Sequence, residues 1–402
     1  MHDNRILGLI DRLSTADLEQ GPGIEAALID IGEPVVLPLI QWLRTREPRD
    51  PKPYLSVFIG LGQSAARHLF LLLSTGSLYE IWYASQALAR IGERAAIPGL
   101  LIVLNTAEDE SLREQVAVAL GQLGAAEAVQ PLLHLLVVAN PGLRMSVAAA
   151  LARIGPPAVD PLVRILDDLG AGVQSRRAAA HVLADMDDER AVEALGTHLD
   201  DRLEDSDIRA SAVLAFGRSG EPAVAARLLR IVEDRAEPAR VRRQAISTLS
   251  PWRHDEYTCA RLVSVAANRS EEPWLRGRAI TALSAPASDG TVANLSDHCR
   301  DALFEHAAHI AADTAENEFL RRVSIEELPL IAPGRSIELL LALLDDPSTQ
   351  IFLTSLSTLH EHGNAAALTT LRDMIADGAQ RSLANVLSSY DALRCRLGLV
   401  PK

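Results

Sequence analysis

The apolar residues of this chain recur at intervals of three and four positions, which is the spacing of one face of an α-helix. One such face begins at Leu112 and is followed, after a short break at Gly124, by a second apolar run, AVQPLLHLL. The apolar positions of the first face are Leu112, Val116, Ala119, Leu120 and Leu123. The pattern therefore predicts two helices joined by a tight corner.

This pair of patterns is repeated along most of the chain. Each copy has a first helix that ends in Ala-Leu-x-x-[Ile/Leu]-Gly, a short turn, and a second helix with an early proline. Glycine is favoured at such a corner because it adopts the left-handed backbone conformation cheaply, and proline is tolerated near a helix start. The corner positions are Gly32, Gly62, Gly92, Gly124, Gly155, Asp187 and Gly220, and the early prolines are Pro38, Pro98, Pro131 and Pro161. The spacing of 30 to 33 residues accommodates two helices of about three turns each.

A single helical hairpin cannot bury its apolar face, so consecutive hairpins must stack side by side. The sequence therefore predicts an all-α fold, a right-handed α-solenoid of about ten two-helix repeats. We expect this repeat domain to cover residues 1–378, with an insertion at about 288–319, and a capping helix and tail to cover residues 379–402. The stacked repeats should have a concave and a convex surface.

The repeated residues resemble a known family. The pattern [Leu/Val/Ile]-Arg-x-x-Ala-x-x-Ala-Leu-x-x-[Ile/Leu]-Gly, followed by Ala and Pro-x-Leu-x-x-Leu, is similar to the short HEAT repeat of the phycobilisome-lyase-like class. The resemblance covers roughly residues 24–377. It implies an armadillo-type superhelix and, because most members of this class are interaction scaffolds and only a minority are enzymes, a role in protein binding.

Composition narrows the range of partners. The net charge of −14 disfavours binding to nucleic acid or anionic lipid, since both need a positive surface. Aromatic residues make up only 4% of the chain, so its core must be built from small aliphatic side chains. The three cysteines, Cys259, Cys299 and Cys395, are odd in number and far apart, which favours a reducing compartment. With no signal peptide or membrane span indicated, we expect a cytoplasmic, bacterial protein without a cofactor.

Arginine occupies one repeated position at the start of each first helix. This arginine column consists of Arg113, Arg144, Arg176, Arg209, Arg242, Arg276 and Arg321. The favoured interpretation is structural, because turn acids of neighbouring repeats are available as partners, namely Glu110, Asp207, Glu237, Glu272 and Glu318. The alternative is a stripe that binds an anion, an acidic partner or nucleic acid, since arginine suits carboxylates and phosphates.

The ridge that should face the concave side is composed like a groove for a partner helix or peptide. Its middle row, which includes Val118, is partly apolar, and its flanks are polar or charged. The candidate partner-binding residues are Trp82, Tyr83, Gln86, Arg90, Glu114, Gln122, Arg153, Arg177, His181 and Arg218. Trp82 and Tyr83 are candidate aromatic anchors. Trp82 is equally well interpreted as the packing cap of a divergent repeat.

Few residues suggest catalysis. Glu305, His306, His309 and Asp313 share one helical side and form a weak metal candidate, although an exposed helix surface has the same composition. One pair, His360-Glu361, lies beside a turn, unlike the repeated His-Glu pairs of deoxyhypusine hydroxylase.

No phosphate loop, HExxH or Gly-x-Ser-x-Gly motif is present. We therefore predict a non-catalytic scaffold or adaptor that binds another protein along its concave face. The alternatives are a lyase- or chaperone-like modifier of a chromophore protein, and a nucleic-acid or anion binder that uses the arginine column.

Overall fold

A computed structural model describes residues 2–16, 20–46, 50, 52–218, 222–285, 295–376 and 383–399. Within these ranges every regular element is a helix, and no strand is present. The chain divides into two compact units, residues 1–215 (unit 1) and residues 216–402 (unit 2). The boundary between the units falls inside the helix α14 (Ser206–Gly217).

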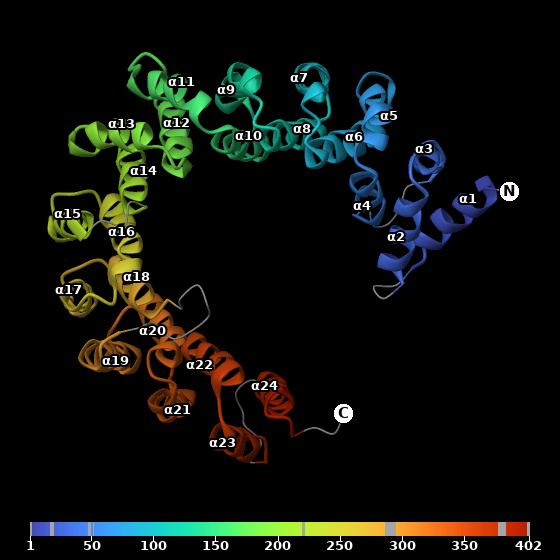
Figure 1. The fold of residues 1–402 in the computed structure, drawn as a ribbon. Coiled ribbons are helices and arrows are strands. Elements are labelled where there is room, and N and C mark those ends of the chain that lie inside the picture. Colours follow the sequence, from blue (N-terminus) through green and yellow to red (C-terminus); the bar gives the residue numbers. More distant parts are fainter. Residues whose placement is uncertain are drawn as a thin grey trace. The chain divides into compact units, whose positions relative to one another are not determined.

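Unit 1 holds the first helices of the chain (Figure 1). They are α1 (His2–Leu13), α2 (Gly21–Ile31), α3 (Val36–Thr45), α4 (Lys52–Leu61), α5 (Gln63–Thr75), α6 (Leu78–Ile91), α7 (Ile97–Thr106), α8 (Glu110–Gln122), α9 (Val129–Val138), α10 (Pro141–Ile154), α11 (Pro156–Asp167), α12 (Val173–Asp185), α13 (Glu189–Asp200) and most of α14. Short 3-10 turns at Glu33–Val35, Arg94–Ala96 and Ala126–Ala128 lead into α3, α7 and α9.

Unit 2 continues the same alternation. Its helices are α15 (Pro222–Glu233), α16 (Ala239–Thr248), α17 (Glu256–Ala267), α18 (Pro273–Ser284), α19 (Asp297–Ala312), α20 (Glu318–Ile331), α21 (Pro333–Ala342), α22 (Thr349–His362), α23 (Ala365–Ala376) and α24 (Leu383–Arg396). Further 3-10 turns lie at Ser250–Trp252 and Leu343–Asp345.

The helices of each unit form two layers. In unit 1 the even-numbered helices α2 to α12 contact one another in chain order, and in unit 2 α16, α18, α20 and α22 do the same; we call these helices layer A. The odd-numbered helices from α3 to α23 form layer B. Most of them, namely α5, α7, α9, α11, α15, α17, α19 and α21, pack against the layer A helix that follows. The described helices α2 to α23 thus make eleven pairs, close to the expected ten. This arrangement confirms the predicted all-α repeat solenoid.

Small residues bring the layer A helices close together. Ala84, Ala87, Ala117 and Ala119 are fully buried or nearly so, as the repeated alanines of the sequence predict. Because layer A helices pack more closely than layer B helices within each unit, each repeat is wedge-shaped. Layer A therefore lies on the concave side of each unit, as Figure 1 shows.

The corners between the helices follow the glycine pattern. The described corner glycines adopt positive φ angles, at Gly32 (82°), Gly62 (56°), Gly92 (81°), Gly124 (58°) and Gly155 (75°). Positive φ at these corners agrees with the predicted role of glycine, since a side chain would strain it. Gly92 has the left-handed helical conformation, with ψ of 25°, whereas Gly32, Gly62 and Gly155 have ψ between −129° and −149°. Gly220 lies outside the described residues. Pro161 differs from the expected place, because α11 begins at Pro156 and so contains Pro161 in its interior.

The insertion expected at residues 288–319 is largely a regular part of the repeat. Residues 297–312 form α19, which contacts α17 and α20 as a layer B helix does. Leu303 and Ala307 on α19 are completely buried. The sequence analysis expected a helix here but assigned it to an insertion, because the residues before it lack the glycine corner; residues 286–294 lie outside the described ranges.

The ends of the array are covered by single helices. α1 packs against α2 and α3, and α24 packs against α22 and α23. α24 lies where the capping helix of residues 379–402 was expected, with residues 379–382 and 400–402 outside the described ranges. The proposed division at residue 378 stays a prediction.

Candidate partner-binding surface

The arginine column is built into the joints between helices. In six of its seven members Nε donates a hydrogen bond to a main-chain carbonyl at the end of the preceding layer B helix. The distances are 3.2 Å for Arg113 to Leu104, 2.7 Å for Arg176 to Leu166, 3.1 Å for Arg209 to Leu199, 2.8 Å for Arg242 to Val232, 2.9 Å for Arg276 to Ala266 and 3.0 Å for Arg321 to Ala311. Arg144 instead uses Nη2, at 2.8 Å from the Ala139 carbonyl. The last carbonyls of a helix have no partner within the helix, so each arginine satisfies one of them.

Four of these arginines also pair with an acid of the next repeat. The pairs are Arg176 with Glu204, Arg242 with Glu271, Arg276 with Glu316 and Arg321 with Asp346. Each acid lies in the turn before the next even-numbered helix, so one guanidinium joins two consecutive repeats. These four arginines are buried, with exposed fractions of 3% to 8%.

The acids that make these pairs differ from those expected. Glu271 pairs with Arg242, whereas the neighbouring Glu272 is exposed. The same holds further along the chain, where Glu316 and not Glu318 pairs with Arg276. Five of the seven column arginines are buried, and Arg113 and Arg144 are half-buried. This burial and the carbonyl and carboxylate partners favour the structural interpretation over the anion-binding stripe.

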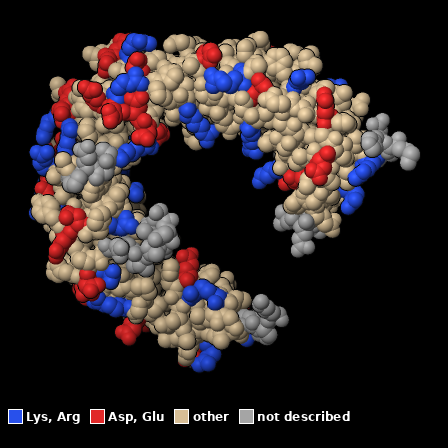
Figure 2. All heavy atoms as spheres, viewed as in Figure 1, with Lys and Arg blue, Asp and Glu red and all other residues tan. Residues whose placement is uncertain are grey.

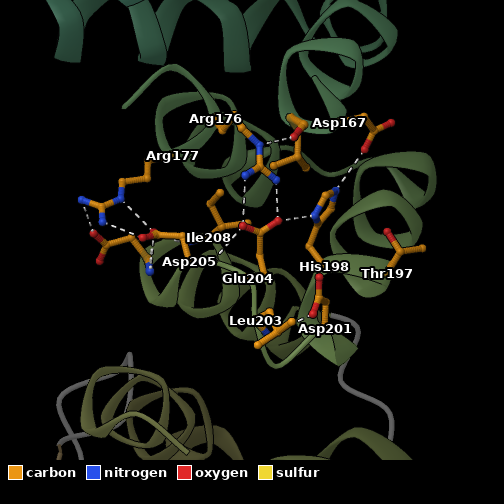
Figure 3. A network of polar contacts seen from close by, with 12 residues as sticks. Asp167, Arg176, Arg177, Thr197, His198, Asp201, Leu203, Glu204, Asp205 and Ile208 are labelled. Carbon is orange, nitrogen blue, oxygen red and sulfur yellow. Dashed lines mark hydrogen bonds and ion pairs between the residues drawn. The ribbon is translucent and has the colours of Figure 1, made fainter. Parts of the chain in front are cut away.

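Figure 3 shows the joint between α12 and α14 in unit 1. Glu204 accepts hydrogen bonds from Arg176, from the main-chain N–H of Asp205 at 2.8 Å and from Nδ1 of His198 at 2.8 Å. Nε2 of His198 lies 3.0 Å from Asp167. Burial alone would raise the pKa of Glu204, but the hydrogen bonds from Arg176, Asp205 and His198 outweigh it and lower the pKa. The joint therefore holds an ionised carboxylate.

Two of the expected binding residues are not on the surface. Tyr83 is 2% exposed and packs edge-to-face against Trp82, with ring centroids 5.0 Å apart. Gln86 is 5% exposed, and its Nε2 donates to Oε1 of Gln115 at 2.9 Å. The exposed ridge therefore does not include Tyr83 or Gln86, because α6 packs against α5 and α8 on those sides. Trp82 is half-buried, as its alternative role in packing requires.

The other candidate residues remain on layer A, except Arg218, which directly follows α14. Exposed side chains are those of Arg90, Gln122, Arg153, His181 and Arg218, and Glu114 is half-buried. Arg177 is different, because its guanidinium lies 2.8 Å from Asp205 and 3.0 Å from Asp207. The hydrogen bond from Arg177 lowers the pKa of Asp205, so this pair is ionised and neutralises the surface around it.

Unit 2 carries layer A residues that the sequence pattern did not single out. Arg243, Arg278 and Arg322 follow the column residues Arg242, Arg276 and Arg321 by one or two positions. Arg322 lines a groove of about 520 Å³ between α20 and α22. The remaining lining residues are Glu326, Gln350, Leu353, Thr354, Ser357, Thr358, Glu361 and His362. A second arginine one or two residues after the column arginine is a sequence signal that could have identified these positions.

The carboxylates of the weak metal candidate take part in separate ion pairs. Glu305 pairs with Arg335, and Asp313 pairs with Arg269, which also approaches His309 at 3.2 Å. Each arginine comes from a neighbouring layer B element, so the carboxylates face cations. Among the described residues, no group of three or more His, Cys, Asp or Glu side chains is placed to hold a metal.

Two of the cysteines are neighbours in the core. Cys259 on α17 and Cys299 on α19 are both buried, and burial together with the hydrogen bond from Cys299 raises the pKa of the Cys259 thiol. A thiol with a raised pKa is a poor nucleophile. This pair therefore fits packing between two layer B helices.

Layer B of unit 1 changes character along the chain. Figure 2 shows mostly uncharged atoms over α5 to α9 and clustered acids and bases over α11 to α13. The exposed residues of the first part include Leu71, Ile102 and Val138. In the second part charged groups pair with each other, as Arg190 does with Asp160 at 3.0 Å. Some of the charges of this part of layer B thus already have partners.

No single helix in the described part of the chain is long and apolar enough to cross a membrane. The bent pair α4 and α5 has sufficient combined length and composition, but it turns by 118° at the corner. Val57, Phe58 and Leu69 of this pair are fully buried within the repeats.

Comparison with known proteins finds one sequence family. A family model described as HEAT repeats matches residues 68–139, 97–176 and 171–250. No curated protein matches the sequence significantly.

Several solved structures are similar in fold. Human deoxyhypusine hydroxylase, in complex with glycerol, is 21% identical with a TM-score of 0.26, covering 62% of this chain and 95% of that one. The complex of CpcE and CpcF of phycocyanin lyase from Nostoc is 20% identical with a TM-score of 0.31, covering 59% and 92%. Kap121p bound to Nup53p is 11% identical with a TM-score of 0.45, covering 96% and 50%. Similarity at this level says nothing about function.

Proposed function

Residues 68–250 of this chain are HEAT repeats, and from this premise we propose that the chain is a non-catalytic scaffold that binds another protein along layer A. Stacked repeats of this kind present an extended concave surface, which suits an elongated partner better than a small substrate.

One observation carries this proposal. The repeated residues make the contacts between stacked helices, whereas the exposed layer A residues differ from repeat to repeat. The column arginines, corner glycines and core leucines have structural partners. The exposed layer A positions instead hold Gln122, Met145, Arg153, His181 and Ser357, which follow no repeat. A surface whose composition varies along its length supports recognition of one particular partner.

The proposal is tested by photo-crosslinking in the source cells. A benzoylphenylalanine residue is placed at Gln122, Arg153 or Ser357 on layer A, and in matched variants at Ile102, Arg164 or Arg230 on layer B. We expect the same protein to be crosslinked from the layer A positions, and from none of the layer B positions. Crosslinks of equal yield from both layers, or no protein crosslink from layer A, would contradict the proposal.

A further inference from the structure

Three arginines on neighbouring layer A helices of unit 2 form a row with few carboxylate neighbours. We call Arg243 on α16, Arg278 on α18 and Arg322 on α20 the basic row. Among the described residues, no carboxylate lies within ion-pair distance of Arg243 or Arg278, and the only one near Arg322 is Glu326 at 3.9 Å. Each lies one or two residues beyond a buried column arginine, so the three stand at the same height along adjacent helices.

The row differs from its counterpart in unit 1. Arg177 follows Arg176 as Arg243 follows Arg242, but Asp205 and Asp207 neutralise it. Exposed guanidinium groups attract carboxylates and can bind them through two parallel hydrogen bonds. The basic row is thus a site for negative charge that is only partly neutralised, by the long Arg322–Glu326 pair, in a chain whose net charge is −14.

An aromatic pair lies beside the row. Trp274 is 57% exposed, and its ring centroid is 3.7 Å from that of Phe319 on the next layer A helix. Trp274 precedes Arg278 by four residues and Phe319 precedes Arg322 by three, so each aromatic shares a helix side with a row arginine. Phe319 is half-buried, so Trp274 offers most of the accessible ring surface. Large, rigid rings of this kind are typical anchors for apolar groups of a partner.

The spacing of the row selects the conformation of the partner. Adjacent packed helices lie about 8 to 10 Å apart. A polyproline II segment has three residues per turn and a rise of about 3.1 Å per residue, so every third side chain lies on one side at intervals of about 9.3 Å. A β-strand places residues i and i+3 on opposite sides and does not match the row. Polyproline II is therefore the extended form that brings one acid to each arginine.

We propose that the basic row and the Trp274–Phe319 pair bind an acidic, proline-rich segment of the partner protein in polyproline II conformation, with an acid at every third residue. This proposal rests on the scaffold function proposed above. Proline rings pack well on aromatic surfaces, and the segment arrives with its conformation already restricted. The carbonyls of polyproline II have no internal partners, and the exposed Gln350 and Ser357 in the adjoining groove are hydrogen-bond donors for them. Glu326 lies one turn beyond Arg322 and repels the acids of the bound segment. We therefore expect these acids to lie on the side of the row that carries the aromatic pair.

The test uses the full chain and a fluorescein-labelled peptide of four Glu-Pro-Pro units, with binding measured by fluorescence anisotropy. We expect saturable binding that weakens steeply with salt, because the arginines are exposed or half-buried and therefore accessible to salt ions. The variant R243Q/R278Q/R322Q should bind about tenfold more weakly, which is equivalent to about 1.4 kcal/mol. The matched control R67Q/R164Q/R230Q has the same change in charge on layer B and should bind as the wild type does.

Two further arms separate this proposal from its alternatives. A peptide of the same composition with its four glutamates contiguous should bind more weakly, and Trp274→Ala should weaken the spaced peptide while preserving the salt dependence. Equal binding of the two peptides, equal loss in both triple variants, or tighter binding of oligothymidylate would overturn the proposal. If the proposal fails but the scaffold function holds, layer A of R243Q/R278Q/R322Q still crosslinks its protein partner. If the scaffold function fails, no layer A crosslink forms in the wild type either.

Discussion

The repeats of α8 and α10 in unit 1 and those of α16, α18 and α20 in unit 2 are joined by different means. At Gly121 the backbones of α8 and α10 approach so closely that a Cβ atom would lie 2.7 Å from Cα of Ala150. In the repeats of unit 2, Ser250 and Ser284 occupy the position equivalent to Gly121. There the buried pairs Arg242–Glu271 and Arg276–Glu316 connect consecutive repeats.

The difference shows that consecutive helical pairs can be held together either by close contact between backbones or by buried ion pairs. In the α8 and α10 region the column arginines bond only to carbonyls, and alanine occupies the place of the acid five residues before Arg144 and Arg176. Close packing needs no ionised group and depends on the absence of a side chain. A buried ion pair tolerates larger residues in the layer, but it leaves a costly charge when one partner is lost.

The largest expected effect comes from removing one acid in unit 2. Glu271→Ala leaves Arg242 buried without its carboxylate, and we expect the free energy of unfolding to fall by about 3 kcal/mol. Glu272→Ala is the matched control, since Glu272 is exposed and its side chain makes no cap hydrogen bond. Urea denaturation followed by circular dichroism measures both. Equal losses in the two variants would show that the pair does not hold the repeats together.

A somewhat smaller loss is expected from filling the contact in unit 1. Gly121→Ala places a methyl group against the backbone of Ala150, and we expect a loss of about 2 kcal/mol from the forced separation of α8 and α10. Gly334→Ala is the control, because no atom lies within 4 Å of its added Cβ. That variant should be stabilised by about 0.5 to 1 kcal/mol, since alanine favours a helix over glycine. A stable Gly121→Ala protein would refute the packing account.

The charged joints should also make unit 2 sensitive to acid, with a smaller change. The hydrogen bond from Arg242 lowers the pKa of Glu271; in Glu316, bonds from Asn317 and Arg276 outweigh burial and lower the pKa. A lowered folded-state pKa gives stability that is present above the unfolded pKa of about 4.3 and is lost as pH falls through the folded value. The advantage of the wild type over Glu271→Gln/Glu316→Gln in urea denaturation should therefore shrink as pH falls from about 6 to 3. An advantage that is independent of pH would contradict this account.

The smallest effect is a gain in unit 1. Ala139→Glu places an acid at the position from which Glu271 reaches Arg242, and thus opposite Arg113. We expect stabilisation of less than about 1 kcal/mol, since Arg113 is only half-buried and exposed pairs contribute little. The double variant Arg113→Met/Ala139→Glu should lose this gain. If the gain persists without Arg113, it comes from something other than a new pair.

The sequence predicts the fold in detail but only part of the site. Periodicity and glycine corners are local signals, so they locate the helices and the positive φ angles at Gly92 and Gly124 correctly. They cannot distinguish Glu271 from Glu272, because the choice depends on the direction in which a turn outside any helix points each side chain. The burial of Tyr83 and Gln86 was missed for a related reason. Neighbouring helices α5 and α8 cover them, and the crossing geometry of those helices is not encoded in a single periodic face.

The placement of each acid and arginine in the chain has a consequence for how such arrays grow. Glu316 precedes Arg321 by five residues, so both belong to one block of sequence, while each bonds to a different neighbouring block. Duplicating that block supplies one acid and one arginine together, and the new copy completes the contacts on both sides. Only the two ends of a lengthened array are left unpaired, whatever its number of copies. A gene can therefore gain repeats by duplication of this block, and no acid or arginine inside the lengthened array is then buried without a partner.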